Sequence, residues 1–275
     1  VIDVLPTLWF RNTWSWGLDD RRPEIRPEGG ALLAEHHELG RFTLGGTGAP
    51  ESLFCDNETN TERLWGRPGL SAFPKDGINE YVVNGAPTVN PEQVGTKAAL
   101  RYRLEVPAGG TAAIRLRLAP ASGGPPKDFD SLMRTREAEA DAFYAAFTPP
   151  GVDDDRALVM RQALAGMLWS KQFYHYDVSR WLEGDPTGPT PPEQRWSGRN
   201  SDWQHLDNRD VISMPDKWEY PWYAAWDLAF HCVALAHVDP EFAKHQLVLL
   251  CREWFMHPNG QLPAYEWAFG DVNPP

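Results

Sequence analysis

The stretch LRYRLEVPAGGTAAIRLRLAPASGGPPKD, from Leu100 to Asp128, contains the change of pattern that decides the fold. Polar and apolar residues alternate on both sides of the turn residues at 107–110, which indicates two strands with one buried face each. We therefore predict an antiparallel hairpin that turns there. The apolar faces of the two strands are Leu100, Tyr102, Leu104 and Val106, then Ile114, Leu116 and Leu118. The Gly- and Pro-rich end of the stretch, Ala121–Asp128, has the composition of a linker.

Short strands are also predicted on the N-terminal side of this stretch. VLPTLWF (4–10) and INEYVVNG (78–85) lie between Gly, Pro and Asn residues that favour turns. Several short strands between regular turns are typical of a β-sandwich. The sequence thus predicts an α+β chain in two parts, in which residues 1–120 form part of an antiparallel β-sandwich domain.

On the C-terminal side the apolar period becomes helical. Residues 121–150 are predicted to form a linker and a linker helix, which Asp130 or Ser131 caps. A second helix is expected from Asp153–Asp155, because acidic side chains suit the positive end of a helix. Residues 151–275 are therefore assigned to a helical part.

Two more helices are expected in this part. One follows Pro221, and the other begins at Asp239–Pro240, with Asp as the cap and Pro at the first helical position, and runs to about Phe255. Before them, residues 177–220 are predicted to be a long irregular segment. Since this segment holds four tryptophans, which disordered segments seldom contain, we expect it to be ordered and to cover a site.

A single carboxylate, Asp227, lies in the apolar helix predicted after Pro221 and is its one formally charged residue before Asp239. A helix that is apolar nearly all round is expected to be buried on most sides. A buried carboxylate costs several kcal/mol unless it is paired or used. Three interpretations remain open: an ion pair with His231 one turn later, a metal site with His231, and a ligand site.

The residues around Asp227 favour the ligand site. Nine of the thirteen tryptophans lie between residues 169 and 267. Aromatic rings beside carboxylates and amides are typical of sugar sites, since the ring faces pack on C–H groups while Asp, Gln and Asn bind hydroxyls. Core packing is the competing interpretation of each aromatic residue taken singly. The candidate binding residues before and around Asp227 are Tyr220, Trp222, Tyr223 and Trp226.

The last stretch, HPNGQLPAYEWAFGDVNPP from His257, supplies a second polar and aromatic cluster on a loop. Its candidate binding residues are Gln261, Glu266 and Trp267. Glu266 is either a functional carboxylate or a solvated one, as most loop glutamates are.

Composition excludes several classes of protein. A net charge of −12 and a pI near 5.1 disfavour a nucleic-acid-binding surface, which needs clustered Lys and Arg. There is no run of apolar residues long enough to cross a membrane, and the N-terminal residues do not resemble a signal peptide. Three widely spaced cysteines, Cys55, Cys232 and Cys251, indicate buried free thiols in a reducing compartment and no CxxC metal site, so we expect a cytoplasmic protein.

Four stretches of the chain resemble bacterial glycoside hydrolase family 63, which includes α-glucosidases that trim oligosaccharides and the related mannosylglycerate hydrolases. They are DNETNTERLWG (56–66), GMLWSKQFYHYDVSRWLEGDP (166–186), DKWEYPWYAAWDLAFHCVALAHVDPEFAKHQL (216–247) and the C-terminal stretch quoted above. The resemblance implies a super-β-sandwich followed by an (α/α)6 barrel. It also implies inverting hydrolysis of an α-glycoside without a redox cofactor, with a carbohydrate substrate as the partner.

The resemblance assigns site residues one by one. Trp226-Asp227 matches the family's Trp-Asp on an early barrel helix, where the Asp holds sugar hydroxyls. Tyr220 and Trp222 match aromatic positions of the same subsite. An inverting enzyme needs a general acid and a general base, and the family has both on later helices. We therefore expect this chain to be a fragment that ends before either catalytic carboxylate, that needs the rest of its barrel and that is inactive alone; Asp227 as the acid is the alternative.

Two rival functions from other classes remain. One is a carbohydrate-binding module without catalysis. The other is a helical-barrel lyase or epimerase, which needs clustered Arg or Lys for an acidic sugar and a His or Tyr base. The arginines of SRW (179–181) and SGRN (197–200) are scattered in the sequence, which places this rival third.

Overall fold

The computed structural model describes residues 1–123, 128–216 and 223–271. It is a mixed α/β fold, in which the strand pairings among the described residues are antiparallel. Contacts between residues divide the chain into a first unit, Val1–Pro126 with Pro186–Pro189, and a second unit, Lys127–Asp185 with Thr190–Pro275. No helix among these described residues has the length and apolar character to cross a membrane.

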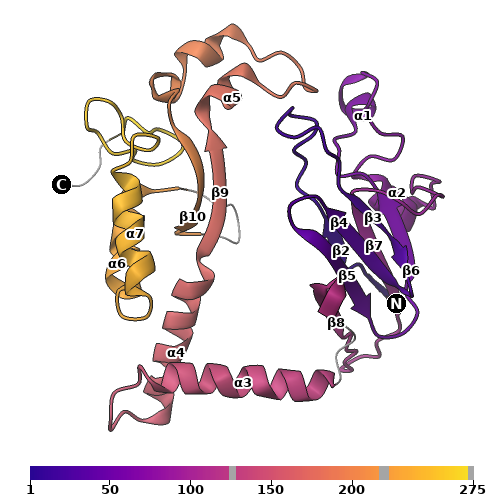
Figure 1. Ribbon diagram of the computed structural model, residues 1–275, viewed down its shortest axis with the longest axis horizontal. Helices are drawn as coiled ribbons and strands as arrows, with labels where there is room; N and C mark the ends of the chain where they lie inside the picture. Colours follow the sequence, from indigo (N-terminus) through magenta and orange to yellow (C-terminus); the bar gives the residue numbers. More distant parts are fainter. Residues whose placement is uncertain (124–127, 217–222, 272–275) are drawn as a thin grey trace. The chain divides into compact units, whose positions relative to one another are not determined.

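The first unit contains two antiparallel sheets (Figure 1). In one, β7 (Lys97–Leu104) is the central strand, and it pairs with β1 (Ile2–Val4), β2 (Thr7–Trp9) and β6 (Glu51–Cys55). The other sheet has the order β3 (Glu24–Glu28), β4 (Ala31–His36), β5 (Gly40–Gly46) and β8 (Leu116–Pro120). The strand predicted in VLPTLWF (4–10) is confirmed as β2, whereas β1 shares only Val4 with that stretch.

The two sheets bury their inner faces in one apolar cluster. Ile25, Leu32 and Leu44 of the β3–β4–β5–β8 sheet lie in it with Leu100 and Tyr102 of β7. Side chains two positions apart on a strand lie on the same face of the sheet, so the apolar residues of each sheet can all face the other sheet. The predicted inner face of β7 is thereby confirmed at these two residues.

The predicted hairpin between residues 100 and 118 is wrong. Both strands exist, but β7 pairs in one sheet while β8 pairs with β5 in the other. The residues between them therefore connect two sheets instead of two neighbouring strands. Leu118 is 55% exposed, which also contradicts the predicted burial of its face. Alternation reports a strand with two faces, but it carries no information about the partner strand.

The strand predicted at residues 78–85 is wrong too, because this segment is the helix α2 (Gly77–Asn84). Ile78, Tyr81 and Val82 pack on β6 residues in a second apolar cluster, and their spacing is that of one helix face. Gly85 ends the helix in the left-handed conformation, with φ of 66°. A short helix, α1 (Thr61–Trp65), precedes it and is capped by Asn60.

Helices α3 (Phe129–Ala145) and α4 (Asp154–Trp169) open the second unit. Asp128 caps α3, two residues earlier than predicted, because its side chain accepts from the N–H of Asp130. The start of α4 is confirmed: Asp153 caps it, with two acidic residues in its first turn.

The predicted irregular segment at 177–220 is wrong in part. Strand β9 (Lys171–Asp177) pairs along its whole length with β10 (Asp207–Ser213), and the helix α5 (Val178–Glu183) lies between them in sequence. Of the described residues of this segment, 184–206 and 214–216 lack longer elements, and 184–206 contain short turns of 3₁₀ helix. Trp203 of this segment is buried in the core, in keeping with the expected order.

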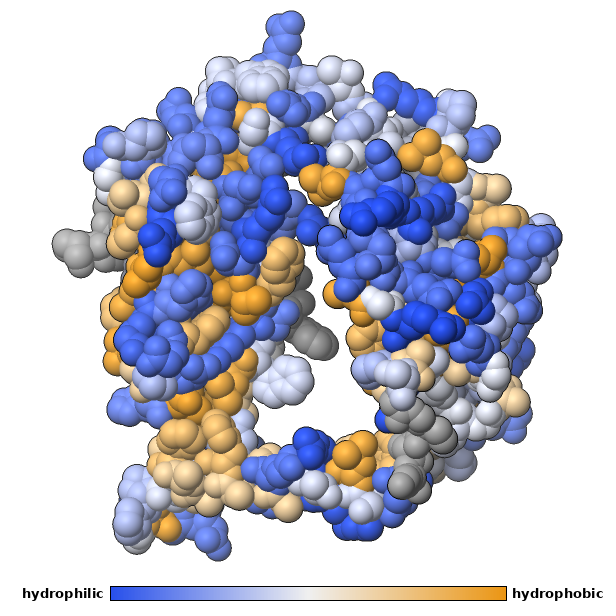
Figure 2. Space-filling view, in the orientation of Figure 1, coloured by the Kyte–Doolittle hydropathy of each residue, from blue (hydrophilic) through white to orange (hydrophobic). Residues whose placement is uncertain are grey.

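Helices α6 (Ala225–Leu235) and α7 (Pro240–Leu250) pack against each other and complete the second unit (Figure 1). Asp239 caps α7 with Pro240 at its first turn, as predicted, although the helix ends five residues before Phe255. The expected burial of α6 on most sides is wrong: Trp226, Phe230 and Val233 form an exposed stripe. Figure 2 shows apolar surface around α4, α6 and α7.

The thiols are only partly as predicted. Cys55 and Cys232 are buried and free, and burial raises the pKa of both, that of Cys55 to about 11. Cys251, at the end of α7, is exposed instead of buried.

Candidate functional site

The candidate site is built on one face of β9. Tyr174 and Tyr176 are two residues apart, so their side chains point to the same face of the strand, where both pack on the core of the second unit. Burial raises the pKa of each phenol, and for Tyr176 a hydrogen bond with Asn200 opposes this effect. The C-terminal loop lies beside these tyrosines, because the ring centre of Phe269 is 5.7 Å from that of Tyr176.

Glu266 is held in place by the backbone before α6. The N–H of Glu266 donates to the carbonyl oxygen of Tyr223 at 3.2 Å, and the N–H of Tyr223 donates to Oε2 of Glu266 at 3.0 Å. Bridges from Tyr265 to Ala224 and Ala268 extend the contact. This reciprocal pairing immobilises a loop carboxylate.

The Glu266 carboxyl group is half-buried, which raises its pKa from the usual value of 4.5. The hydrogen bonds from its own N–H and from that of Tyr223 oppose the shift, as does the charge of Arg199. A carboxylate that is partly desolvated, yet keeps one oxygen outside this bond to Tyr223, is suited to accept a hydrogen bond from a ligand hydroxyl.

Asn200 clamps the loop at 198–203 to the loop that carries Glu266. Its Nδ2 donates to the carbonyl oxygen of Glu266, and its Oδ1 accepts from the N–H of Phe269 at 2.9 Å. The residue has φ of 62°, a conformation that Asn adopts more readily than most other residues. Its buried amide thus replaces backbone pairing between two irregular segments.

Arg199 lies between two indole rings at the rim of the site. Its guanidinium carbon is 4.3 Å from the ring centre of Trp267 and 5.3 Å from that of Trp181. Arg195 approaches Trp181 as well, at 5.0 Å, and donates to its carbonyl oxygen. Arg199 of SGRN therefore meets Arg195 at Trp181 of α5, whereas Arg180 of SRW pairs with Asp177.

The predicted site residues fall into three groups. Tyr223, Glu266 and Trp267 are brought together as described, but the ring of Tyr223 is 0% exposed and stacks on Tyr174, so its backbone is the part that serves the site. Trp267 is 51% exposed and offers a ring face at the surface. Burial raises the pKa of Tyr223 far above its usual value.

Trp226 and Asp227 form the second group, in the first turn of α6, where a carboxylate suits the helix dipole. Trp226 packs edge-on against Phe230 and is exposed, and Asp227 is half-buried. His231 hydrogen-bonds to Ser213 Oγ at 2.8 Å. Burial lowers the pKa of His231, and the charge of Asp227 opposes this.

The third group holds the remaining candidates, Gln261, Tyr220 and Trp222. Gln261 is half-buried in a turn in which its N–H and carbonyl bond to Asn259 and His257. Tyr220 and Trp222 lie outside the described residues.

The metal interpretation of Asp227 gains no support. Among the described residues, the one group of three His, Cys, Asp or Glu side chains close enough to share an ion is Asp19, His37 and Glu38, in the first unit. Only the Glu38 side chain of this group is largely exposed, and Asp19 pairs with Arg21 as well as with His37.

Sequence reasoning missed Tyr174, Tyr176, Arg199 and Asn200 as site residues. The alternation in QFYHYD (172–177) was the available signal, since it places both tyrosines on one strand face. No local pattern identifies Arg199 and Asn200, because their partners are far away in sequence.

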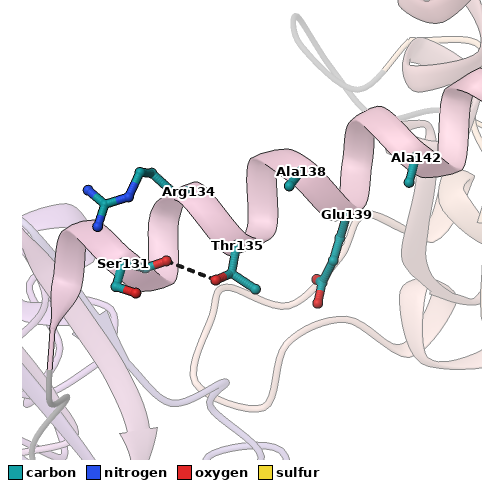
Figure 3. Close-up of a pocket in the computed structure, with 6 residues that line it drawn as sticks. All are labelled: Ser131, Arg134, Thr135, Ala138, Glu139 and Ala142. Atoms are coloured by element: carbon teal, nitrogen blue, oxygen red, sulfur yellow. Dashed lines mark hydrogen bonds between the residues drawn. The ribbon is translucent and has the colours of Figure 1, made fainter.

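A shallow depression on α3 is a poor candidate for a site (Figure 3). Its lining residues all come from this one helix, so no second element encloses it. The hydrogen bond drawn there, from Thr135 Oγ1 to the carbonyl oxygen of Ser131, is a local contact within the helix.

Comparison with known proteins identifies a long relative. No protein-family model matches the chain. It is similar to "Uncharacterized protein YMR196W" of Saccharomyces cerevisiae, with 40% identity over 319 residues, which covers 99% of this chain. The chain spans only 29% of the length of that yeast protein. The fold of this chain therefore corresponds to one part of a much larger polypeptide in yeast.

Proposed function

We propose that this chain belongs to an inverting glycoside hydrolase similar to family 63, which removes α-linked glucosyl or related residues from oligosaccharides or small glycosides. The chain supplies part of the subsite that holds the sugar on the non-reducing side of the scissile bond. The observation that carries the proposal is the fixed, half-buried Glu266 carboxylate beside the exposed ring of Trp267.

The roles follow from the chemistry of each side chain. Glu266 accepts hydrogen bonds from sugar hydroxyls, and Trp267 packs on the C–H face of the ring. Asp227 and Trp226 on α6 extend the subsite, with Tyr220, Trp222 and Gln261 as further contacts. No cofactor is required, because hydrolysis by inversion uses two carboxyl groups and a water molecule.

The finer architecture is part of the same proposal. The apolar core shared by the two sheets is the argument for an antiparallel β-sandwich. The exposed apolar stripe on α6 is the argument for further helices of an (α/α)6 barrel, which would pack on it. The general acid and base then belong to the rest of the polypeptide, with Asp227 as the alternative acid. The yeast relative is long enough to hold such a barrel. A cytoplasmic location also belongs to the proposal and is supported by the free thiols.

The test is an assay of the full-length protein that contains this chain, with an aryl α-glucoside and α-linked oligosaccharides. We expect hydrolysis, and proton NMR of the first product detects the inverted anomer. Glu266→Gln and Asp227→Asn should each lower kcat/KM at least tenfold, whereas Glu253→Gln, on the exposed surface, should not. Sugar binding without turnover would overturn the enzyme proposal in favour of a binding module.

One observation favours a second candidate, a lyase or epimerase that acts on acidic sugars. Arg195 and Arg199 both lie over Trp181, close to the tyrosines of β9, and this class needs clustered cations and a phenol or imidazole base. The raised phenol pKa values of Tyr174 and Tyr176 argue against an easily ionised base. Turnover of a uronate substrate with formation of an unsaturated product would select this candidate.

A further inference from the structure

The stretch DNETNTERLWG, which the site in the second unit does not use, builds a cavity in the first unit. The cavity has a volume of about 270 Å³, and the residues that matter here are Ser15, Glu58, Thr59, Thr61, Arg67 and Leu70. The Pro186–Pro189 segment, which belongs to the same unit, completes the wall. Arg67 holds this segment by donating to the carbonyl oxygen of Gly188 at 2.7 Å.

Glu58 is the unusual residue of this cavity, because it is a carboxylate that is only 3% exposed. Its Oε1 accepts a hydrogen bond from Trp14 Nε1 at 2.7 Å and forms an ion pair with Arg22 Nη2 at 3.0 Å. Its Oε2 is buried and has no hydrogen-bond partner among the described residues. A buried carboxylate oxygen without a donor is costly, so Oε2 requires a donor from outside the described residues.

The charges around Glu58 favour a neutral donor. Arg22 is shared, because it also pairs with Asp56 at 2.6 Å, which leaves the two carboxylates with one excess negative charge. Arg67 on the cavity wall offsets that charge. A cationic ligand would meet the guanidinium group of Arg67 on the cavity wall, and an anionic ligand would meet the unpartnered Glu58 oxygen.

The rest of the lining fits a hydroxylated ligand. Ser15, Thr59 and Thr61 offer hydroxyl groups, while Leu70 and the neighbouring Pro68 offer an apolar wall. Hydroxyl groups are both donors and acceptors, so they can satisfy Glu58 and these side chains together. The volume lies just below the common range of ligand sites, which limits the ligand to the size of a monosaccharide.

We propose that this cavity binds a neutral polyol of monosaccharide size, one hydroxyl of which donates to Oε2 of Glu58. The proposal uses residues of the first unit alone and does not depend on hydrolytic activity. It assigns a binding role to the motif at residues 56–66.

The test is a titration of the 275-residue chain, labelled with ¹⁵N, with glucose and with glycerol. The indole N–H of Trp14 is bonded to Glu58, so its resonance, assigned with Trp14→Phe, reports on the cavity directly. We expect it to shift in a saturable way with glucose. Glu58→Gln should raise the Kd at least tenfold, and Glu92→Gln, an exposed control, should leave it unchanged.

A second variant guards against misfolding of Glu58→Gln. Thr59→Leu adds bulk at the half-buried wall and should abolish the shift while the melting temperature is kept. Glu266→Gln should not alter the titration, so that failure of the glycosidase proposal and failure of this one are distinguishable. No shift with either polyol would mean that water alone satisfies Glu58, and binding of glucosamine but not glucose would show a cation site; both results overturn the proposal.

Discussion

The backbone N–H of Tyr223 donates to Oε2 of Glu266 at 3.0 Å, and this bond joins the segment before α6 to the C-terminal loop. It places a carboxylate where burial raises its pKa, and it leaves the side chain little freedom to rotate. The fully buried ring of Tyr223 anchors the other end of the contact in the core. A rigid scaffold thereby positions a loop residue, which is the usual origin of a binding site on a loop.

Glu266→Gln should change how stability depends on pH. The folded-state pKa of Glu266 is raised, so the folded protein favours the protonated carboxyl group and ionisation opposes folding. The stability that the protonated group provides is fully present below the unfolded pKa of 4.5 and is lost as pH rises through the raised folded pKa. Wild type should therefore lose stability relative to Glu266→Gln between these two pH values. Urea unfolding across this range measures the difference, and a constant difference would contradict the burial of Glu266.

Arg199→Ala should raise the pKa of Glu266 further, because the charge of Arg199 lowers it. The carboxyl ¹³C shift of Glu266 followed by NMR against pH gives the value. The lost contact with Trp267 should cost no more than about 1 kcal/mol, as is usual for an exposed cation–π pair. Arg209→Ala, an exposed arginine paired with Asp207, is the matched control and should not move the Glu266 titration.

Asp239→Ala should destabilise the second unit by about 1–2 kcal/mol through loss of a helix cap. The side chain accepts from the N–H of Phe242 at 3.1 Å and also pairs with Lys171 at the start of β9. Asp239→Asn keeps the cap and should cost less. The hydrogen bond with Lys171 is the main reason why the pKa of Asp239 is lowered. The stability that ionised Asp239 provides is therefore present above the unfolded pKa of 3.8 and is lost as pH falls through the lowered folded pKa. Equal losses for both variants in urea unfolding at neutral pH would contradict the capping role.

Two glycine substitutions should have opposite signs. A Cβ at Gly95 would lie 2.2 Å from the carbonyl oxygen of Cys55, so Gly95→Ala should destabilise the first unit by about 1–3 kcal/mol through overpacking. Gly166, within α4, has open space where a Cβ would lie, and Gly166→Ala should stabilise the helix by about 1 kcal/mol. The melting temperatures of both variants test these expectations. Destabilisation by Gly166→Ala as well as by Gly95→Ala would contradict the open space found at Gly166.

Phe230→Lys should reduce self-association of the 275-residue chain. Phe230 is 66% exposed in the apolar stripe on α6, so the change should leave stability within about 0.5 kcal/mol, as for most surface sites. Light scattering after gel filtration gives the mass. Leu118→Lys, at an exposed apolar residue of the first unit, is the control. An equal effect of both changes would show that self-association does not depend on the apolar stripe of α6.

The sequence predicted local elements well where a chemical signal marks their ends. Asp153 and Asp239 each offer a side-chain acceptor to free N–H groups, so the starts of α4 and α7 follow from the residues themselves. The segment 78–85 misled the prediction because it has residues that strands prefer. Its helix is selected by the packing of Ile78, Tyr81 and Val82 on the sheet.

The candidate site was predictable only in part. Glu266 and Trp267 stand out in the sequence as a polar and aromatic pair on a loop, but nothing local predicts that Tyr223 binds Glu266 across 43 residues. The gathering of Arg199, Trp181 and Trp267 likewise depends on long-range folding.

By itself the sequence determined local periodicities and the caps at Asp153 and Asp239. Tertiary structure alone decided that β8 pairs with β5, that α6 keeps an exposed apolar stripe, and that Glu58 and Glu266 are buried to different extents. The physical reason is that propensity and capping act between neighbours in sequence. Burial, strand partners and pKa shifts depend on contacts between residues that only the folded chain brings together.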